Sequence, residues 1–134
     1  MRISLFFVVL SGCAANSPKN LCTSPATDKY NIYFAPNSIA LDYKSVDTAK
    51  QLAQFASCCG KKITLKGYTD ILWSQAYNLK LAQHRVDAVK DMLISLGVPA
   101  EDISVIPYGY ADPVAEGNSK EANALNRRVV AALN

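Results

Sequence analysis

The sequence has little of what enzymes, metal proteins and nucleic-acid-binding proteins need. His84 is its one histidine, and its four cysteines form no Cys-x-x-Cys pair, so we expect neither a metal site nor a cofactor. We find no Gly-x-Ser-x-Gly motif, no setting typical of a reactive cysteine and no carboxylate pair of the glycosidase kind, so we expect no enzyme. The formal net charge of +3 is too small to indicate nucleic acid as a partner.

The sequence also lacks an apolar run of the roughly 20 residues that span a bilayer. A short apolar stretch, Ile3 to Leu10, follows Met1-Arg2 and precedes small residues, which is typical of a secretory signal. Leu10-Ser11-Gly12-Cys13 resembles the lipobox of bacterial lipoproteins. In those proteins the chain is cut before the cysteine, whose thiol receives a diacylglycerol, and the new amino terminus takes a fatty acid such as palmitate. We therefore predict a signal peptide at 1–12 and lipidation at Cys13, the alternative being a chance match within an ordinary signal.

The stretch from Cys13 to Asp28 is polar, contains two prolines and shows no apolar period, so we predict a flexible tether over 13–28. Ala14 follows the cysteine, and the absence of an aspartate there points to the outer membrane by resemblance to enterobacterial lipoproteins. An exported chain can form disulfides. Two states remain open: one bridge that joins Cys22 to Cys58 or Cys59, or three reduced thiols.

One folded domain is expected over 29–134, in which strands and helices alternate. Alternating apolar residues predict strands that start near Tyr30, Ile63 and Ile103. The apolar residues Val129, Val130 and Leu133 predict a closing strand at 129–133. Apolar steps of three and four residues predict two long helices. The first has Ser45 as a candidate N-cap and ends at Gly60, the second carries an apolar stripe from Leu79 to Leu96, and a short polar helix precedes the last strand. This order predicts an α/β sandwich with its helices on one face of one sheet.

Three polar residues near the second strand and second helix form a candidate site. Asp70 ends the strand, and Arg85 follows fifteen residues later within the helix. Asn78 lies two helical turns before Arg85, so both project from nearly the same face. A carboxylate opposite a guanidinium can hold a zwitterion, the arginine fork taking a carboxylate and the aspartate an ammonium. The alternative is a structural salt bridge between Asp70 and Arg85 with no ligand.

Several motifs in order resemble the OmpA-like peptidoglycan-binding domain, as found in lipoproteins associated with peptidoglycan. They are Gly67-Tyr68-Thr69-Asp70, the helical stretch 78–86 around Arg85, then Gly109, Pro113, Asn118 and Asn126-Arg127-Arg128-Val129. The resemblance runs from Tyr30 to Leu133. It implies a βαβαββ fold, with helices packed on one mixed sheet, that binds peptidoglycan noncovalently.

The resemblance also implies roles for individual residues. Asp70 would hold the ammonium of diaminopimelate in the peptide stem of peptidoglycan, and Arg85 its carboxylate. Asn37, Thr69 and Asn78 would add hydrogen bonds to the same ligand. The family's arginine beside the pocket stands at Arg127, with a role in ligand contact or loop support.

The resemblance implies an outer-membrane lipoprotein, with its domain in the periplasm, that ties the outer membrane to the cell wall. The chain departs from the family pattern at Tyr68, where histidine is usual, at Asn123, where arginine is usual, and at Ile71-Leu72-Trp73, which makes an apolar loop. That loop and the extra cysteines motivate an alternative. In it the chain is an accessory lipoprotein of an envelope-spanning secretion or motor complex, with further protein partners, and uses wall binding for positioning.

Overall fold

The computed structural model describes residues 28–134. The predicted signal peptide, Cys13, Cys22 and the tether up to residue 27 lie outside these residues. Within the described part, no helix combines the length and the hydropathy needed to cross a membrane.

Four strands form one mixed sheet in the order β1-β4-β2-β3. The strands are β1 (Lys29–Tyr33), β2 (Ile63–Tyr68), β3 (Ile103–Gly109) and β4 (Arg128–Leu133). Strand β4 pairs antiparallel with both β1 and β2, and β2 pairs parallel with β3. The apolar residues Val129, Ala131 and Leu133 of β4 are buried in the core, on the face of the sheet that the helices cover.

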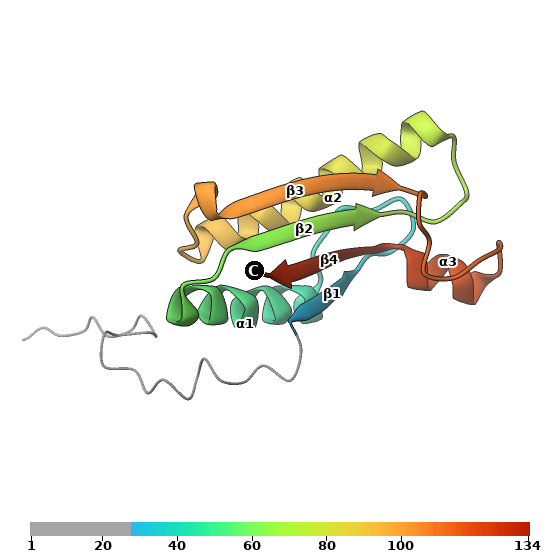
Figure 1. The fold of residues 1–134 in the computed structure, drawn as a ribbon. Coiled ribbons are helices and arrows are strands. Elements are labelled where there is room, and N and C mark those ends of the chain that lie inside the picture. Colours follow the sequence, from blue (N-terminus) through green and yellow to red (C-terminus); the bar gives the residue numbers. More distant parts are fainter. Residues whose placement is uncertain (1–27) are drawn as a thin grey trace, which may run out of the picture.

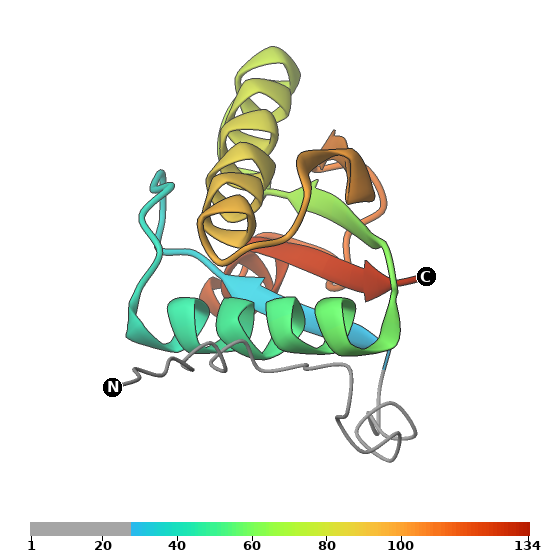
Figure 2. The same ribbon diagram turned by 90° about the vertical axis from the view of Figure 1, so that its left-hand side faces the viewer.

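Three α-helices and a short 3-10 turn connect the strands. They are α1 (Tyr43–Cys59), α2 (Gln75–Ser95), the turn η3 (Ala100–Asp102) and α3 (Lys120–Asn126). Helices α1 and α2 lie against one face of the sheet, and α3 lies beyond the end where β4 begins (Figures 1 and 2). The α/β class and the single helix-covered sheet agree with the prediction.

One apolar core fills the space between the sheet and helices α1 and α2. Leu52, Leu65, Val86 and Val129 come from four different elements and are fully buried within it. Gly67 lets α2 approach β2 closely, because a Cβ there would lie 2.7 Å from both the Ala82 carbonyl oxygen and a Val86 methyl. The glycine of this motif is therefore a packing requirement.

Two predictions about the helices need correction, one on the N-cap of α1 and one on the buried face of α2. Asp42 caps α1, and Ser45 is the residue whose backbone N–H donates to the Asp42 carboxylate at 2.8 Å. Both residue types serve as N-caps, so composition could not choose between them. Leu79 is 46% exposed rather than buried, because polar Asn78 and Arg85 occupy the buried line of α2 at that end. Gly60 and Gly97 adopt positive φ just after α1 and α2, and α1 ends at Gly60 as predicted.

Candidate functional site

The predicted site residues gather at one end of the sheet. That end is where β1, β2 and β3 finish and β4 begins, as the pairings Tyr33–Arg128 and Tyr68–Gly109 require (Figure 1). Four of the predicted residues are nearly inaccessible, with exposed fractions of 0–2%: Thr69, Asp70, Asn78 and Arg85. Arg127 is 15% exposed at its side chain. Polar groups this deep in a protein need partners, so their contacts define what the site can do.

Arg85 donates to three backbone carbonyl oxygens. Its Nε lies 3.0 Å from the oxygen of Ser38, Nη1 3.1 Å from that of Tyr68, and Nη2 3.2 Å from that of Ala35. Its Cζ also lies 5.0 Å from the centre of the Phe34 ring. The guanidinium therefore joins α2 to the end of β2 and to the loop after β1.

The charge of Arg85 is buried without a close counter-ion. Burial lowers the pKa of Arg85 to about 10, the Asp70 carboxylate raises it and Arg127 lowers it. Within residues 28–134, Arg85 makes no ion pair within 4.0 Å. Two of its five N–H donors remain beyond the three bonds to carbonyls, so a ligand carboxylate at this position would gain both charge and hydrogen bonds.

Asp70 pairs with Arg127 rather than with Arg85. Its Oδ2 lies 3.5 Å from Arg127 Nη1, and its Oδ1 accepts from the Leu72 backbone N–H at 3.2 Å. Arg127 in turn donates through Nε to the Phe34 carbonyl oxygen at 2.9 Å. The alternative of a structural Asp70–Arg85 salt bridge is thus not what the structure shows. The 3.5 Å contact is also longer than the 2.7–2.9 Å typical of charge-assisted hydrogen bonds.

Asn78 links α2 to the loop after β2 through hydrogen bonds. Its Nδ2 donates to the carbonyl oxygens of Asp70 and Trp73, at 3.3 and 3.1 Å. Its Oδ1 and the Thr69 Oγ1 are buried and have no hydrogen-bond partner among the described residues. Two unsatisfied polar atoms that flank Asp70 are a feature expected of a binding site, because a buried group without a partner is costly.

Asn37 lies at the rim of the same site. It adopts a positive φ of 50° in the loop after β1, a conformation that asparagine tolerates better than most residues. Its Oδ1 accepts a hydrogen bond from the hydroxyl of Tyr77, in the first turn of α2. This bond holds the exposed Asn37 beside the start of α2.

Two asparagines that the resemblance did not assign to the site hold the surrounding loops. Asn126 is fully buried and binds three backbone groups of Val114 and Ala115. Asn123 accepts from the Ile71 backbone N–H at 3.5 Å and donates to Asn118 Oδ1 at 2.8 Å. The asparagine that replaces the family's usual arginine at 123 therefore links the two loops that border the site.

A stack of three side chains lies on the face of the sheet opposite the core. The rings of Tyr68 and Tyr108 are parallel within 5°, with centres 5.2 Å apart, and Arg128 Cζ lies 4.0 Å from the centre of the Tyr68 ring. Burial lowers the pKa of Arg128, and the neighbouring tyrosines raise it. Strand alternation could have placed Arg128 on this face, since Val129 points into the core.

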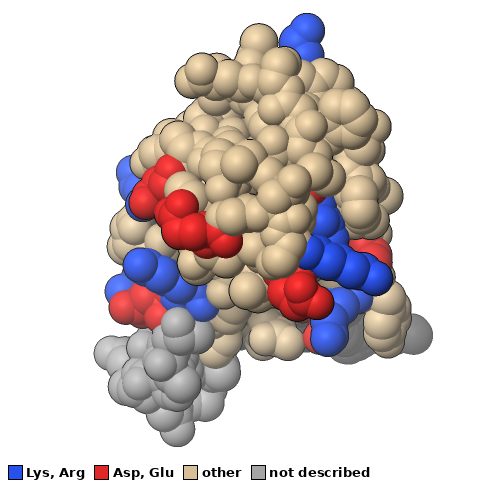
Figure 3. All heavy atoms as spheres, turned by 90° about the vertical axis from the view of Figure 1, so that its right-hand side faces the viewer, with Lys and Arg blue, Asp and Glu red and all other residues tan. Residues whose placement is uncertain are grey.

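The loop after β2 and the start of α2 expose apolar side chains. Ile71, Leu72 and Trp73 are 39%, 50% and 48% exposed. Figure 3 views this end of the molecule and shows a broad surface without charged side chains, with the acidic and basic groups mainly below it. His84 is exposed on α2. Among the described residues, no group of three or more histidine, cysteine or acidic residues is arranged to hold a metal ion.

Cys58 is disulfide-bonded. Its predicted partner, Cys22, lies outside the described residues.

The model of the OmpA family matches residues 33–127. The peptidoglycan-associated lipoprotein of Buchnera aphidicola subsp. Baizongia pistaciae is 38% identical over 100 residues, 74% of this chain and 58% of its own length. That of Pasteurella multocida is 33% identical over 106 residues, 78% of this chain and 71% of its own length. The crystal structure of the peptidoglycan-associated lipoprotein from Burkholderia pseudomallei superimposes with a TM-score of 0.74 at 30% identity, over 78% of this chain and 89% of the other.

Proposed function

The chain belongs to the OmpA family, and we propose that it is a lipoprotein whose domain binds the diaminopimelate residue of peptidoglycan noncovalently. The bound residue is the zwitterionic end of a peptide stem. The proposed anchor is Cys13, with lipid in the outer membrane and the domain in the periplasm. The protein would then tie the outer membrane to the cell wall.

The buried constellation around Asp70 and Arg85 is the observation that carries the proposal. A carboxylate and a guanidinium with donors to spare lie at one end of the sheet, and Thr69 and Asn78 add two unsatisfied polar atoms. A zwitterion supplies what each group needs: an ammonium for Asp70, a carboxylate for Arg85 and hydrogen bonds for the two neutral groups. The names of the relatives, peptidoglycan-associated lipoproteins, support peptidoglycan as the binding partner.

Arg127 has a defined part in this proposal. Its 3.5 Å contact leaves the Asp70 carboxylate able to accept a shorter bond from a ligand ammonium. Its Nε bond to the Phe34 carbonyl oxygen keeps it in place when the ligand binds. Arg127 thus supports the loop after β1 and balances the charge of Asp70 until the ammonium arrives.

Co-sedimentation with purified diaminopimelate-type peptidoglycan tests the proposal. The wild-type protein should pellet with the wall, and Asp70→Asn should remain in the supernatant, because asparagine is nearly the same size but has no charge for the ammonium. Asp91→Asn is the matched control, since Asp91 is exposed near the other end of α2. If Asp70→Asn pelleted as the wild type does, the site assignment would be wrong.

The exposed loop 71–73 favours a second candidate, an accessory lipoprotein of an envelope-spanning secretion or motor complex. Apolar side chains that are 39–50% exposed in a row are more typical of a protein contact than of a solvated loop. Affinity purification of cross-linked envelope complexes tests this, with a Leu72→Ser variant as comparison. Recovery of the same proteins with both would count against a role of the loop in assembly.

A further inference from the structure

One face of the sheet is covered by helices α1 and α2, and the other face is open. Ile32, Leu65 and Val129 point into the core on the covered face. Because side chains alternate along a strand, the residues between them point to the open side. Figure 1 views the sheet from this side, with α2 behind β2 and β3. We call this surface the open face; its larger side chains are Lys29, Tyr33, Lys66, Ile106, Arg128 and Val130.

The charged residues of the four strands are all basic and all point to the open face. They are Lys29, Lys66 and Arg128, and no residue of β1, β2, β3 or β4 is acidic. Lys66 and Arg128 make no ion pair within 4.0 Å with any residue from 28 to 134, and the charge of Asp112 acts on Arg128 from beyond that distance. The open face therefore attracts anionic groups.

Apolar and aromatic side chains lie beside these charges. Val130 pairs across the strands with Asn31 and with Lys66, and Lys66 pairs with Ile106, so the four form one row across the sheet. Ile106 is 38% exposed, and Tyr33, at the end of β1, is 46% exposed. A tyrosine ring and a lysine with its aliphatic stem are side chains that suit the boundary between lipid and water.

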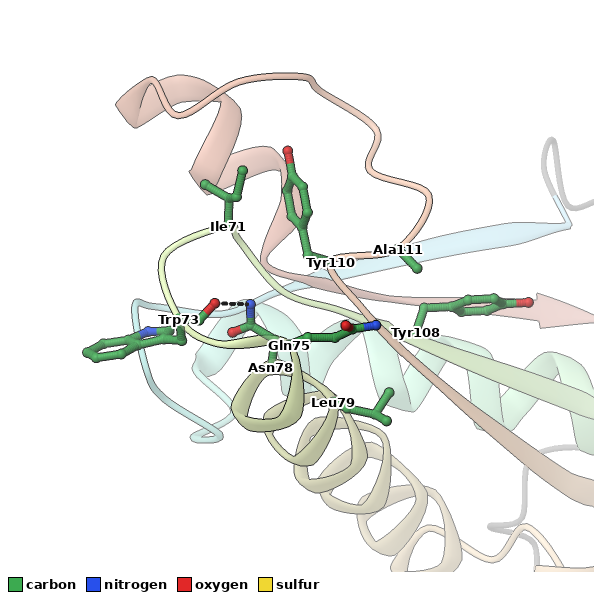
Figure 4. A pocket seen from close by; sticks show the side chains of 8 residues that line it. All are labelled: Ile71, Trp73, Gln75, Asn78, Leu79, Tyr108, Tyr110 and Ala111. Carbon is green, nitrogen blue, oxygen red and sulfur yellow. Dashed lines mark hydrogen bonds between the residues drawn. The ribbon is translucent and has the colours of Figure 1, made fainter.

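The open face is a different surface from the loop 71–73. The stacked rings of Tyr68 and Tyr108 lie on the open side of the sheet, at the end near the Asp70 site. Figure 4 shows the Tyr108 ring directed away from Ile71 and Trp73. A partner on the open face therefore does not occupy the surface of that loop.

The size of the open face limits what can bind there. From the spacing of strands and residues in a sheet, it measures about 14 Å by 17 Å, or about 240 Å². A stable protein complex buries about 800 Å² on each partner, so a free protein would not remain bound. A second copy would also bring the same positive charge. A partner to which the chain is already attached needs much less surface, because the attachment raises its local concentration.

We propose that the open face rests on the membrane that holds the Cys13 anchor, with anionic lipid headgroups against Lys29 and Lys66. The inference rests on the proposed function, because the membrane is brought to the domain by that anchor. Lys29 directly follows the predicted tether, residues 13–28, which spans at most about 55 Å when extended. The open face can therefore reach the membrane surface, and Arg128 adds positive charge behind the two lysines.

Quenching of a single tryptophan tests the inference on the full-length lipidated protein in vesicles. Trp73→Phe removes the one tryptophan of the sequence, and Tyr33→Trp then places a reporter on the open face. His84→Trp in the same background is the matched control, because His84 is exposed on α2. The vesicles are phosphatidylcholine alone or an equal mixture of phosphatidylcholine and phosphatidylglycerol. Both contain the same share of a lipid with a nitroxide quencher on its headgroup.

The nitroxide should quench Tyr33→Trp more strongly in the mixed vesicles and quench His84→Trp equally in both kinds. Adding Lys66→Gln should lower the ratio of docked to undocked protein about fivefold, the effect of one basic residue at an anionic surface. Lys66→Arg keeps the charge and should keep the quenching.

Two results would overturn the inference while the proposed function stands: equal quenching of Tyr33→Trp in both kinds of vesicle, or unchanged quenching after Lys66→Gln. Protein that floats with neither kind of vesicle would contradict the Cys13 anchor, and the inference with it. Co-sedimentation with peptidoglycan tests the Asp70 site separately, so failure of one assay is distinguishable from failure of the other.

Discussion

Replacing Arg85 by lysine should destabilise the domain strongly even though the positive charge is kept. The guanidinium reaches three carbonyl oxygens in three directions, those of Ala35, Ser38 and Tyr68, from a side chain that is 0% exposed. A lysine ammonium is a single point on a flexible stem and cannot reach all three. At least one buried carbonyl loses its partner.

The expected magnitude follows from those bonds. Each buried carbonyl left without a donor costs about 1–3 kcal/mol. Loss of one or two of the three gives about 2–4 kcal/mol for Arg85→Lys, and Arg85→Ala should cost more because it loses all three and leaves a cavity. For a domain near 100 residues, each kcal/mol lowers Tm by about 4–8 °C. A fall in Tm of about 8 °C or more is therefore expected for Arg85→Lys.

Urea unfolding followed by circular dichroism measures this loss, with Lys80→Ala on the exposed surface of α2 as the control. If the free energy of unfolding of Arg85→Lys were within about 0.5 kcal/mol of the wild-type value, the guanidinium would not hold the three carbonyls as described. The result also bears on binding assays. Loss of wall binding in an Arg85 variant would mix a lost ligand contact with unfolding, so Asp70→Asn is the cleaner test of the site.

Three further predictions follow from single contacts. Asn78→Asp replaces the amide donor with an oxygen that faces two carbonyl oxygens, and should lower the urea midpoint by an amount equivalent to about 2–4 kcal/mol; an unchanged midpoint would rule out both bonds. Gly67→Ala places a Cβ 2.7 Å from a methyl of Val86 and should cost about 1–3 kcal/mol in thermal unfolding, and equal stability would mean that α2 can move away freely. The hydrogen bond from the Ser45 backbone lowers the pKa of Asp42 below its ordinary value of 3.8. The ionised carboxylate therefore stabilises the folded protein fully above pH 3.8, and this stabilisation is lost as the pH falls through the lowered pKa. Asp42→Asn should accordingly lose less stability than the wild type between about pH 7 and about pH 2, and parallel pH profiles of the two proteins would contradict the capping role.

The sequence predicted the parts of the fold that depend on local periodicity. Alternation in β1, β2 and β3 and the apolar stripe of α2 each follow from burial of one face, so the elements and the helix-covered sheet were recognisable. The failures are local choices between similar residues. Asp42 and Ser45 can both cap a helix, and the buried line of α2 carries polar side chains at the end where the spacing predicted Leu79 as a core residue.

The sequence predicted that the candidate site residues lie near one another, but it did not predict which contacts they make. Spacing and resemblance brought Asp70, Asn78 and Arg85 together, and the structure places them at one end of the sheet. No local pattern could show that Asp70 meets Arg127, 57 positions away, or that Arg85 binds the carbonyls of a loop about 50 positions before it. Such contacts depend on how loops from distant segments meet at the end of a sheet.

The central claim is that the site recognises diaminopimelate through both of its charged ends. Calorimetry of the wild-type protein with Ala-γ-Glu-diaminopimelate and with Ala-γ-Glu-Lys tests it directly, because lysine keeps the side-chain ammonium but lacks the second carboxylate. Loss of a charge-assisted contact to the buried Arg85 should weaken binding by about 2–3 kcal/mol, or about 30- to 150-fold. Equal affinity for the two peptides would contradict the account.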